Sequence, residues 1–425
     1  MRRIILGLLM LPMMALGQTL EECQQAAERN YPLIRQYDLI GKTIDLTIAN
    51  IDKGWLPQLT GSAQTTYQSD VTRFPDAMQQ MYRQLGIDMD GLKKDQYRVG
   101  IEVQQTVFDG GVMKSQKEIA REQGKVQAAE NEVNLYKIRK RVNEMFFGLL
   151  LTDEQIQLNQ DLQELLGVNE KKLASMFKSG TAAESDYLNV KAERLKVMQQ
   201  ATELQTQRQA LARMLSVFCG IEVNKPQTPS GVESESRSLN AINQRPELKA
   251  IDARLKLADA REKALDAALK PKVGVFAQGF YGYPGYDAFD AMFNHDWKLN
   301  GMIGARLVWN IDGLYRNKTD KRKIQAQRNL IETGRETFLF NNSLLQIQQN
   351  EGIAKYRQLI AEDDDIVSLR SQVRQSAESK LTHGIIDTNN LLQEITRENQ
   401  AKIDRSTHEV QMLKETYDLK YTTNN

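Results

Sequence analysis

The spacing between apolar residues changes along the chain, and the same order of changes occurs twice. Between Pro32 and Pro57, and again between Pro246 and Pro271, apolar residues recur every three or four positions, which is typical of one face of a helix. These positions are Ile40, Ile44, Ile48 and Ile51 in the first segment and Leu255, Ala258, Leu265 and Leu269 in the second. Both proline pairs are 25 residues apart. Because proline interrupts helix interiors, each pair predicts the limits of one short helix.

Beyond each of these helices the apolar spacing falls to two, which indicates β-strands with one apolar face. We expect two strands in each half, with lengths of about 10 to 13 residues, enough to cross a bilayer at the tilt of a barrel. A polar loop, residues 71–96, and a shorter aromatic loop, residues 283–296, join the strands of each pair. The apolar faces of the expected strands run from Leu59 to Tyr67, Val99 to Val107, Val273 to Tyr281 and Leu299 to Trp309.

Aromatic residues stand near the ends of these strands, as they do at the two surfaces of a membrane. They are Tyr67, Tyr97, Tyr281, Trp297 and Trp309. Each pair of strands ends in an Asp-Gly sequence, Asp109-Gly110 in the first half and Asp312-Gly313 in the second. We expect a turn there, with the aspartate capping the helix that follows.

The longest segments of the chain carry apolar residues at every seventh position, which predicts the seam of a coiled coil. Residues 113–177 lack proline, and a helix of that length would extend for about 95 Å. Lys178-Ser179-Gly180 and His383-Gly384 interrupt the two long runs. Because glycine commonly ends helices, we expect an antiparallel helical hairpin with a glycine at its tip in each half.

The N-terminus has the composition of a secretory signal. Residues 1–17 contain Arg2 and Arg3, an apolar run from Ile4 to Leu16 and small residues at the end. The run is shorter than the roughly 20 residues of a spanning helix, which disfavours a membrane anchor. We therefore expect cleavage after residue 17, followed by a first repeat over residues 18–223, a linker over 224–240 and a second repeat over 241–425.

Composition excludes several classes of protein. The 425 residues are 41% apolar and 26% charged, with a mean hydropathy of -0.52, which fits neither a bundle of apolar membrane helices nor a disordered chain. A net charge of +1 gives no sign of nucleic-acid binding. Cys23 and Cys219 would both reach an oxidising compartment. We expect them to be unpaired residues near helix ends, with a disulfide as the alternative.

Catalysis is not expected. The sequence lacks the motifs of metalloproteases, serine hydrolases and dinucleotide-binding folds, and His295, His383 and His408 are scattered. No metal or cofactor is expected. Four strands cannot close a membrane barrel, which needs about eight, so other copies of the chain must complete it. The alternative is a periplasmic coiled-coil scaffold or adhesin without a pore, but that leaves the four alternating segments unexplained.

The chain resembles the TolC family of outer-membrane efflux proteins over residues 19 to 420. The resemblance rests on TLEECQQAAERNYPLI near the mature start, WLPQL and LKPKV before the strands, VFDGG after them, and SGTAAESDYLN and HGIIDTNNLLQ at the two tips. It implies a mainly α fold with a membrane β-barrel portion: a homotrimer with a 12-stranded barrel continued by long helical hairpins into the periplasm. It also implies a periplasmic adaptor protein and an inner-membrane transporter as partners.

The resemblance also implies roles for the hairpin tips. In the family, side chains six and nine positions after the tip glycine close the tunnel; here they are Asp186, Asn189, Asn390 and Gln393. The tip residues expected to contact the adaptor are Ser179, Gly180, Thr181, His383 and Gly384. Ile386 stands where some members carry a basic latch residue. Asp186 and Asp387 also occupy positions suited to helix capping, and both roles are open at this point. The sequence does not identify the exported substrate.

Overall fold

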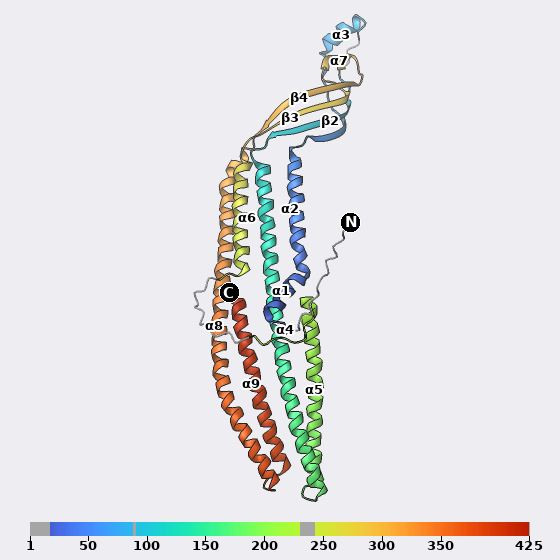
Figure 1. The fold of residues 1–425 in the computed structure, drawn as a ribbon. Helices are drawn as coiled ribbons and strands as arrows, with labels where there is room; N and C mark the ends of the chain where they lie inside the picture. The colour runs from blue at the N-terminus through green and yellow to red at the C-terminus, as the bar shows by residue number, and fades with distance from the viewer. Residues whose placement is uncertain (1–17, 88–90, 230–242, 425) are drawn as a thin grey trace, which may run out of the picture. The chain divides into compact units, whose positions relative to one another are not determined.

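The computed structural model of the protein describes residues 18–87, 91–229 and 243–424 (Figure 1). These residues form two compact units, and each unit takes segments from both halves of the sequence. The helical unit consists of the described residues within Met1–Tyr37, Ala129–Ala250 and Gly334–Asn425. The sheet unit consists of those within Asp38–Ala128 and Ile251–Thr333. The signal peptide predicted for residues 1–17 lies outside the described residues.

The sheet unit contains four antiparallel strands in the order β1-β2-β3-β4 (Figure 1). Strands β1 (Gln58–Tyr67) and β2 (Asp95–Phe108) come from the first half, and β3 (Lys272–Tyr283) and β4 (Lys298–Val308) from the second. The central pair, β2 and β3, joins the two halves and places Ile101 opposite Gly279. All four strands were predicted, each within a few residues of its limits.

The strands alternate as the sequence predicted. On one face the side chains are apolar and exposed: Leu59 is 70% exposed, Ile101 57% and Ile303 86%. The other face carries polar and charged residues such as Gln64, Glu102 and Arg306. Within the part of the chain that the structure describes, most of this apolar face is uncovered; only at its end near Tyr283, which is 3% exposed, do other residues pack on it.

Short helices interrupt both loops between strands, where the sequence predicted none. Helix α3 (Asp76–Gln84) lies in the first loop and α7 (Ala288–Phe293) in the second. The side chain of Asp287 accepts a hydrogen bond from the Asp290 amide and so caps α7. A helix of two turns is too short to establish a periodic pattern, which explains why both were missed.

The short helices predicted between the prolines are present in both halves. Pro32 opens a 3-10 turn, η1 (Pro32–Arg35), which leads into α2 (Gln36–Asp52) and the turn η2 (Lys53–Trp55). In the second half α6 (Pro246–Ala268) begins at proline itself. Proline fits the first helical turn because the amide that it lacks would have no partner there.

The junction of strand and long helix differs between the halves. Asp109 is 6% exposed, and its carboxylate accepts hydrogen bonds from the amides of Gly111 at 2.8 Å and Met113 at 2.6 Å. It therefore caps α4 (Val112–Lys178), as predicted. Asp312 instead is the first residue of α8 (Asp312–Thr382), and its carboxylate accepts from the Arg316 side chain. Both junctions have three residues between strand and helix, but Asp312 lies three positions later than Asp109 does, inside the helix, so the predicted cap is wrong there.

The helical unit is built from helical hairpins with α1 (Leu20–Asn30) beside them. Helix α4 turns at residues 179–183 into α5 (Glu184–Cys219), and α8 turns at residues 383–387 into α9 (Thr388–Thr423) (Figure 1). The predicted hairpins are therefore confirmed. No described helix is both long enough and apolar enough to span a membrane. The division into repeats over 18–223 and 241–425 stays a prediction.

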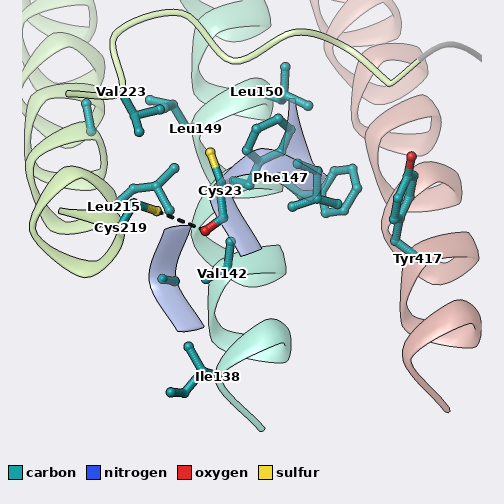
Figure 2. Close-up of a cluster of buried hydrophobic side chains, with 14 of the residues drawn as sticks. Cys23, Ile138, Val142, Phe147, Leu149, Leu150, Leu215, Cys219, Val223 and Tyr417 are labelled. Carbon is teal, nitrogen blue, oxygen red and sulfur yellow. Dashed lines mark hydrogen bonds between the residues drawn. The ribbon is translucent and has the colours of Figure 1, made fainter. Parts of the chain in front are cut away.

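A buried apolar cluster, here the upper cluster, joins α1, α4, α5 and α9. Figure 2 shows Cys23 and Cys219 within it beside large side chains of α4. Both cysteines are free thiols, and the Cys219 thiol donates to the carbonyl of Cys23 at 3.3 Å. The hydrogen bond to Cys219 and burial raise the pKa of the Cys23 thiol. The expected unpaired state agrees with the structure, but the cysteines are neighbours rather than isolated residues.

We expect Phe146→Ala to lower the free energy of unfolding by about 3–5 kcal/mol, because Phe146 is 0% exposed in this cluster and its loss leaves a cavity. Thermal and denaturant unfolding followed by circular dichroism in detergent measures the change. Val217→Ala is the control, since Val217 on α5 is 77% exposed. Equal stability of the two variants would contradict the assignment of this core.

Candidate functional site

Both hairpin tips use the same hydrogen-bonded helix ending. At the end of α4, the amide of Gly180 donates to the carbonyl of Phe177 at 3.0 Å, and that of Thr181 to Met176 at 2.9 Å. At the end of α8, the amide of Gly384 donates to Leu381 at 3.0 Å, and the amide of the next residue donates to Lys380 at 2.9 Å. This pair of bonds defines the Schellman motif, which satisfies the last carbonyls of a helix.

The tip glycines adopt the left-handed backbone that this motif requires. Gly180 has a φ of 75° and Gly384 a φ of 68°. No described atom lies within 4 Å of the place where a β-carbon would be at either glycine. The requirement for glycine is therefore conformational rather than steric, since other L-residues adopt this backbone at a cost of roughly 1–2 kcal/mol.

The side chains of the tip residues add hydrogen bonds to the turn. The hydroxyls of Ser179 and Thr181 both donate to the carbonyl of Met176, at 3.0 and 3.1 Å. The His383 ring nitrogen Nδ1 lies 2.8 Å from the carbonyl of Ser379 and donates to it. All the tip residues predicted for adaptor contact are exposed. They therefore form two ordered, accessible turns.

The helices that leave the tips begin with capping aspartates. The amide of Ala183 donates to the carboxylate of Asp186 at 3.3 Å, and Asp186 lies in the first turn of α5. Asp387 is the N-cap of α9, and its carboxylate accepts from the amide of Asn390 at 2.8 Å. The capping role is present at both. Capping does not exclude a second role for Asp186, because one carboxylate oxygen has no capping bond.

The four predicted gate residues occupy matching positions on two helices. Asp186 and Asn189 are three residues apart on α5, and Asn390 and Gln393 are three apart on α9, so each pair shares one helix face. Asp186 is half-buried, and the other three are exposed. Among the described residues, none forms a hydrogen bond with the side chain of Asn189, Asn390 or Gln393.

An apolar cluster just above the tips, here the lower cluster, holds the two hairpins together. It contains residues from α4, α5, α8 and α9, and Ile386 packs against it. The Lys172 ammonium also donates to the Thr382 hydroxyl at 2.5 Å, linking α4 to the end of α8. Ile386, at the position where the resemblance implied a basic latch residue in some members, therefore contributes apolar contact. The buried members of the cluster are Leu166, Leu173, Val190, Val197, Ala377, Leu381, Leu391 and Ile395.

A buried ionic network above the second tip fixes α8 against α9. Glu398 of α9 is 3% exposed; its carboxylate accepts from the Ser371 hydroxyl at 2.6 Å and the Lys402 ammonium at 3.0 Å, and it pairs with Arg374. Burial raises the pKa of Glu398, but these hydrogen bonds and the positive charges of Lys402 and Arg374 outweigh burial and hold the pKa below its usual value.

Neither this network nor the contact of four helices in the lower cluster was predicted from the sequence. The spacing of four residues between Arg374 and Glu378, and between Glu398 and Lys402, is a local signal of ion pairs on one helix. The pairing of Arg374 with Glu398 across helices has no such signal, because it depends on the register of the hairpin.

The three histidines are apart, as predicted. His408 of α9 pairs with Asp363 of α8 at 2.6 Å, and a ring nitrogen of His295 lies 3.0 Å from the carbonyl of Gly91 in the sheet unit. Among the described residues no group of three or more potential ligands could hold a metal ion.

The depressed pKa of Glu398 has a consequence for stability. The ionised form is favoured in the folded protein, so its contribution is present above the unfolded pKa, near 4.5, and is lost as the pH falls through the lower folded pKa. We expect Glu398→Gln to lower the melting temperature at pH 7, and we expect the difference from wild type to vanish in acid. Melting curves between pH 7 and pH 3 measure this.

Glu409 of α9 is the matched control because burial raises its pKa. A raised folded pKa favours folding below the unfolded pKa, and that advantage is lost as the pH rises. Glu409→Gln should therefore raise the melting temperature at pH 7, with no difference in acid. The same sign at both positions would contradict the assigned electrostatics.

Comparisons with known proteins find one family match, over part of the chain, and several solved structures of similar fold. The outer membrane efflux protein family model matches residues 42–220. A search of curated protein sequences found no match. Among solved structures the chain is similar to the outer membrane protein VceC from Vibrio cholerae, at 14% identity and a TM-score of 0.64, covering 94% of each chain.

Two further channels have the same fold. The outer membrane channel CmeC of Campylobacter jejuni is 10% identical with a TM-score of 0.65, covering 95% of this chain and 85% of that one. The open state of the Neisseria gonorrhoeae channel MtrE is 14% identical with a TM-score of 0.62, covering 96% and 89%. The family match over residues 42–220 and the shared fold agree with the resemblance found in the sequence: that part of the chain matches the outer membrane efflux protein family, and the chain has the fold of outer membrane channels.

Proposed function

We propose that three copies of this chain form the exit duct of a tripartite efflux system, through which small molecules or proteins pass passively. The observation that carries the proposal is a four-stranded sheet with an exposed apolar face and two edges that lack a partner strand among the described residues. In lipid every backbone amide and carbonyl needs a partner, so such a sheet must be completed from outside the chain.

The strand directions support completion by further copies. Because all three pairings are antiparallel, β4 runs opposite to β1. When β4 of one copy lies beside β1 of the next, the new pair is antiparallel as well. The two strands also match in length, at 11 and 10 residues. Three four-stranded sheets then supply twelve strands, and a ring of this kind leaves no edge.

The helical unit supports a duct rather than a compact domain. Long helices in it expose large apolar side chains, including Leu339, Phe340 and Leu369 on α8 and Leu195 on α5. Exposed apolar surface of this extent marks an interface. Neighbouring copies would cover it and close the hairpins into a tunnel.

The tips are the proposed gate and docking surface. Asp186, Asn189, Asn390 and Gln393 would face the tunnel near its periplasmic end and restrict it. The exposed turns at Ser179, Gly180, Thr181, His383 and Gly384 would contact the adaptor, which separates the hairpins. No step in this mechanism needs catalysis or a cofactor, because the energy comes from the inner-membrane transporter.

A scaffold or adhesin without a pore is the alternative. It would account for the hairpins but would leave the apolar face of the sheet exposed to water. Ile303 and Leu299 alone are 86% and 82% exposed. A chain of that kind would be soluble without detergent, which separates the two functions by experiment.

We expect the purified protein to require detergent, to have a protein mass of about three chains because closed rings repeat the same interface, and to conduct ions in planar bilayers. Light scattering with the detergent contribution removed measures the mass, and single-channel recording measures the conductance. A monomer that is soluble without detergent, or a trimer without conductance, would overturn the duct.

The gate assignment has its own test in single-channel recordings. We expect Asp186→Ala to change conductance and weaken cation preference, since it removes one carboxylate per copy from the constriction, and Asn390→Asp to strengthen that preference. Glu203→Ala, which removes an exposed carboxylate of α5 farther from the tip, is the control. If both tip variants conduct like the control, these residues do not form the gate.

A further inference from the structure

The charged residues of the sheet are concentrated on its polar face. This face consists of the even-numbered positions, because side chains alternate along a strand. It carries four cations, Arg98, Lys272, Lys298 and Arg306, and one carboxylate, Glu102. The only charged strand residue on the apolar face is Asp95, at the first position of β2. Lys298 pairs with Asp290 of α7, so the remaining excess of positive charge comes from two arginines and Lys272.

Both arginines lie over aromatic rings of β3. The guanidinium carbon of Arg98 is 4.0 Å from the ring centre of Phe280, and that of Arg306 is 4.9 Å from the ring centre of Phe276. Among the described residues neither arginine has a carboxylate within ion-pair distance. Glu102 instead accepts from the Gln104 side chain at 2.6 Å. The two guanidinium groups are therefore oriented by stacking and keep donors for a further anion.

Glycines on the neighbouring strands lie close against the two phenylalanines. Gly100 of β2 lies opposite Phe280, and Gly304 of β4 lies opposite Phe276. A β-carbon at Gly100 would come within 2.8 Å of the Phe280 β-carbon, and one at Gly304 within 2.7 Å of the Phe276 ring. Arg98 is two residues from Gly100 on β2, and Arg306 is two residues from Gly304 on β4. The sheet therefore contains the same arrangement of a glycine, a phenylalanine and an arginine twice.

An open hollow of about 440 Å³ adjoins the second arrangement. It lies between the polar face of β2 to β4 and the first turns of α4. Its polar lining consists mainly of donors, including Arg306, Lys272 and Gln116, while Phe276 and Val308 supply apolar surface. The one carboxylate of the lining, Asp109, already accepts from two backbone amides. The hollow therefore combines an apolar wall with unused positive donors.

We propose that the polar face of this sheet binds amphipathic organic anions during export, with an anionic head on Arg98 or Arg306 and an apolar body against the phenylalanine wall. The inference rests on the proposed duct, because the polar face lines its lumen only when copies close the barrel. In that ring every copy contributes its two arginines. The lumen of the barrel then favours the binding of anions, independently of any ion selectivity at the periplasmic tips.

The test uses the full-length trimer in planar bilayers, with 8-anilino-1-naphthalenesulfonate as the anionic probe. Its matched control is N-phenyl-1-naphthylamine, the same aromatic skeleton without the sulfonate. Arg98→Gln with Arg306→Gln forms the double variant. Lys256→Gln is the control variant, since Lys256 is an exposed cation on α6 outside the strands.

In the wild type we expect the sulfonate probe to block the current and the neutral probe not to block it. In the double variant the half-blocking concentration should rise about 10-fold, from the loss of two stacked cations, and the permeability ratio of chloride to potassium should fall. Lys256→Gln should match the wild type. Arg306→Lys should keep the ion selectivity but lose part of the block, because lysine retains the charge without the planar donor fork.

The outcomes separate this inference from the duct itself. If no channel forms, the proposed duct is overturned, and the proposed anion-binding surface of its lumen is overturned with it. If channels form but the double variant retains the ion selectivity and the sulfonate block of the wild type, the duct stands and the anion surface is overturned. Equal block by the neutral probe would also overturn it, since the sulfonate would then contribute nothing.

Discussion

Hydrogen bonding of the backbone at the two outer strands is the constraint on which the rest of this structure depends. β1 and β4 each have a neighbouring strand on one side only, and the apolar face beside them is suited to lipid. A bilayer offers no water to satisfy the free amides and carbonyls. The chain therefore cannot occupy a membrane alone, and the proposed assembly, lumen and tunnel all follow from the need to close these edges.

The helical unit meets a different requirement, which is to keep very long helices in register. Two apolar clusters set that register at separate heights, one around Phe146 and one just above the tips. The Schellman endings at Gly180 and Gly384 turn both hairpins in the same way. Between the second tip and the upper cluster, Glu398 adds a buried charge that is stable only while its partners remain in place. The two halves thus share a backbone plan but differ in their polar contacts.

The sequence predicted the elements well because their signals are periodic and long. The four strands, the long helices and both glycine tips all follow from spacing that persists over many residues. What it missed depends on contacts between distant segments or on single-residue changes. Helices α3 and α7 are too short to show a period, and Asp312 is the first residue of α8, so it does not occupy the capping position. Cys23 and Cys219, 196 residues apart, become neighbours only through the packing of α1 on α5.

The candidate site was predictable in part for the same reason. The glycine turns and the capping aspartates have local sequence signals, and the structure contains both. Whether Asp186 and Asn390 line a tunnel depends on how neighbouring copies are arranged, and the sequence of one chain carries no signal for that arrangement. The stacked arginines were not identified in advance, because alternation places Arg98 and Arg306 on the polar face without indicating that β3 brings a phenylalanine beneath each.

The pairing of β2 with β3 also sets an order for folding. Tyr97 pairs with Tyr283, and the whole first hairpin lies between these two strands in the sequence. Each α-hairpin and each β-hairpin can form from neighbouring segments, whereas the β2–β3 contact must close a loop of well over a hundred residues, which slows its formation. The sheet is therefore assembled after the parts that flank it, and its outer edges are satisfied last. In the proposed duct the outer edges of β1 and β4 would stay unpaired until copies meet, so the chain would depend on protection from aggregation until then.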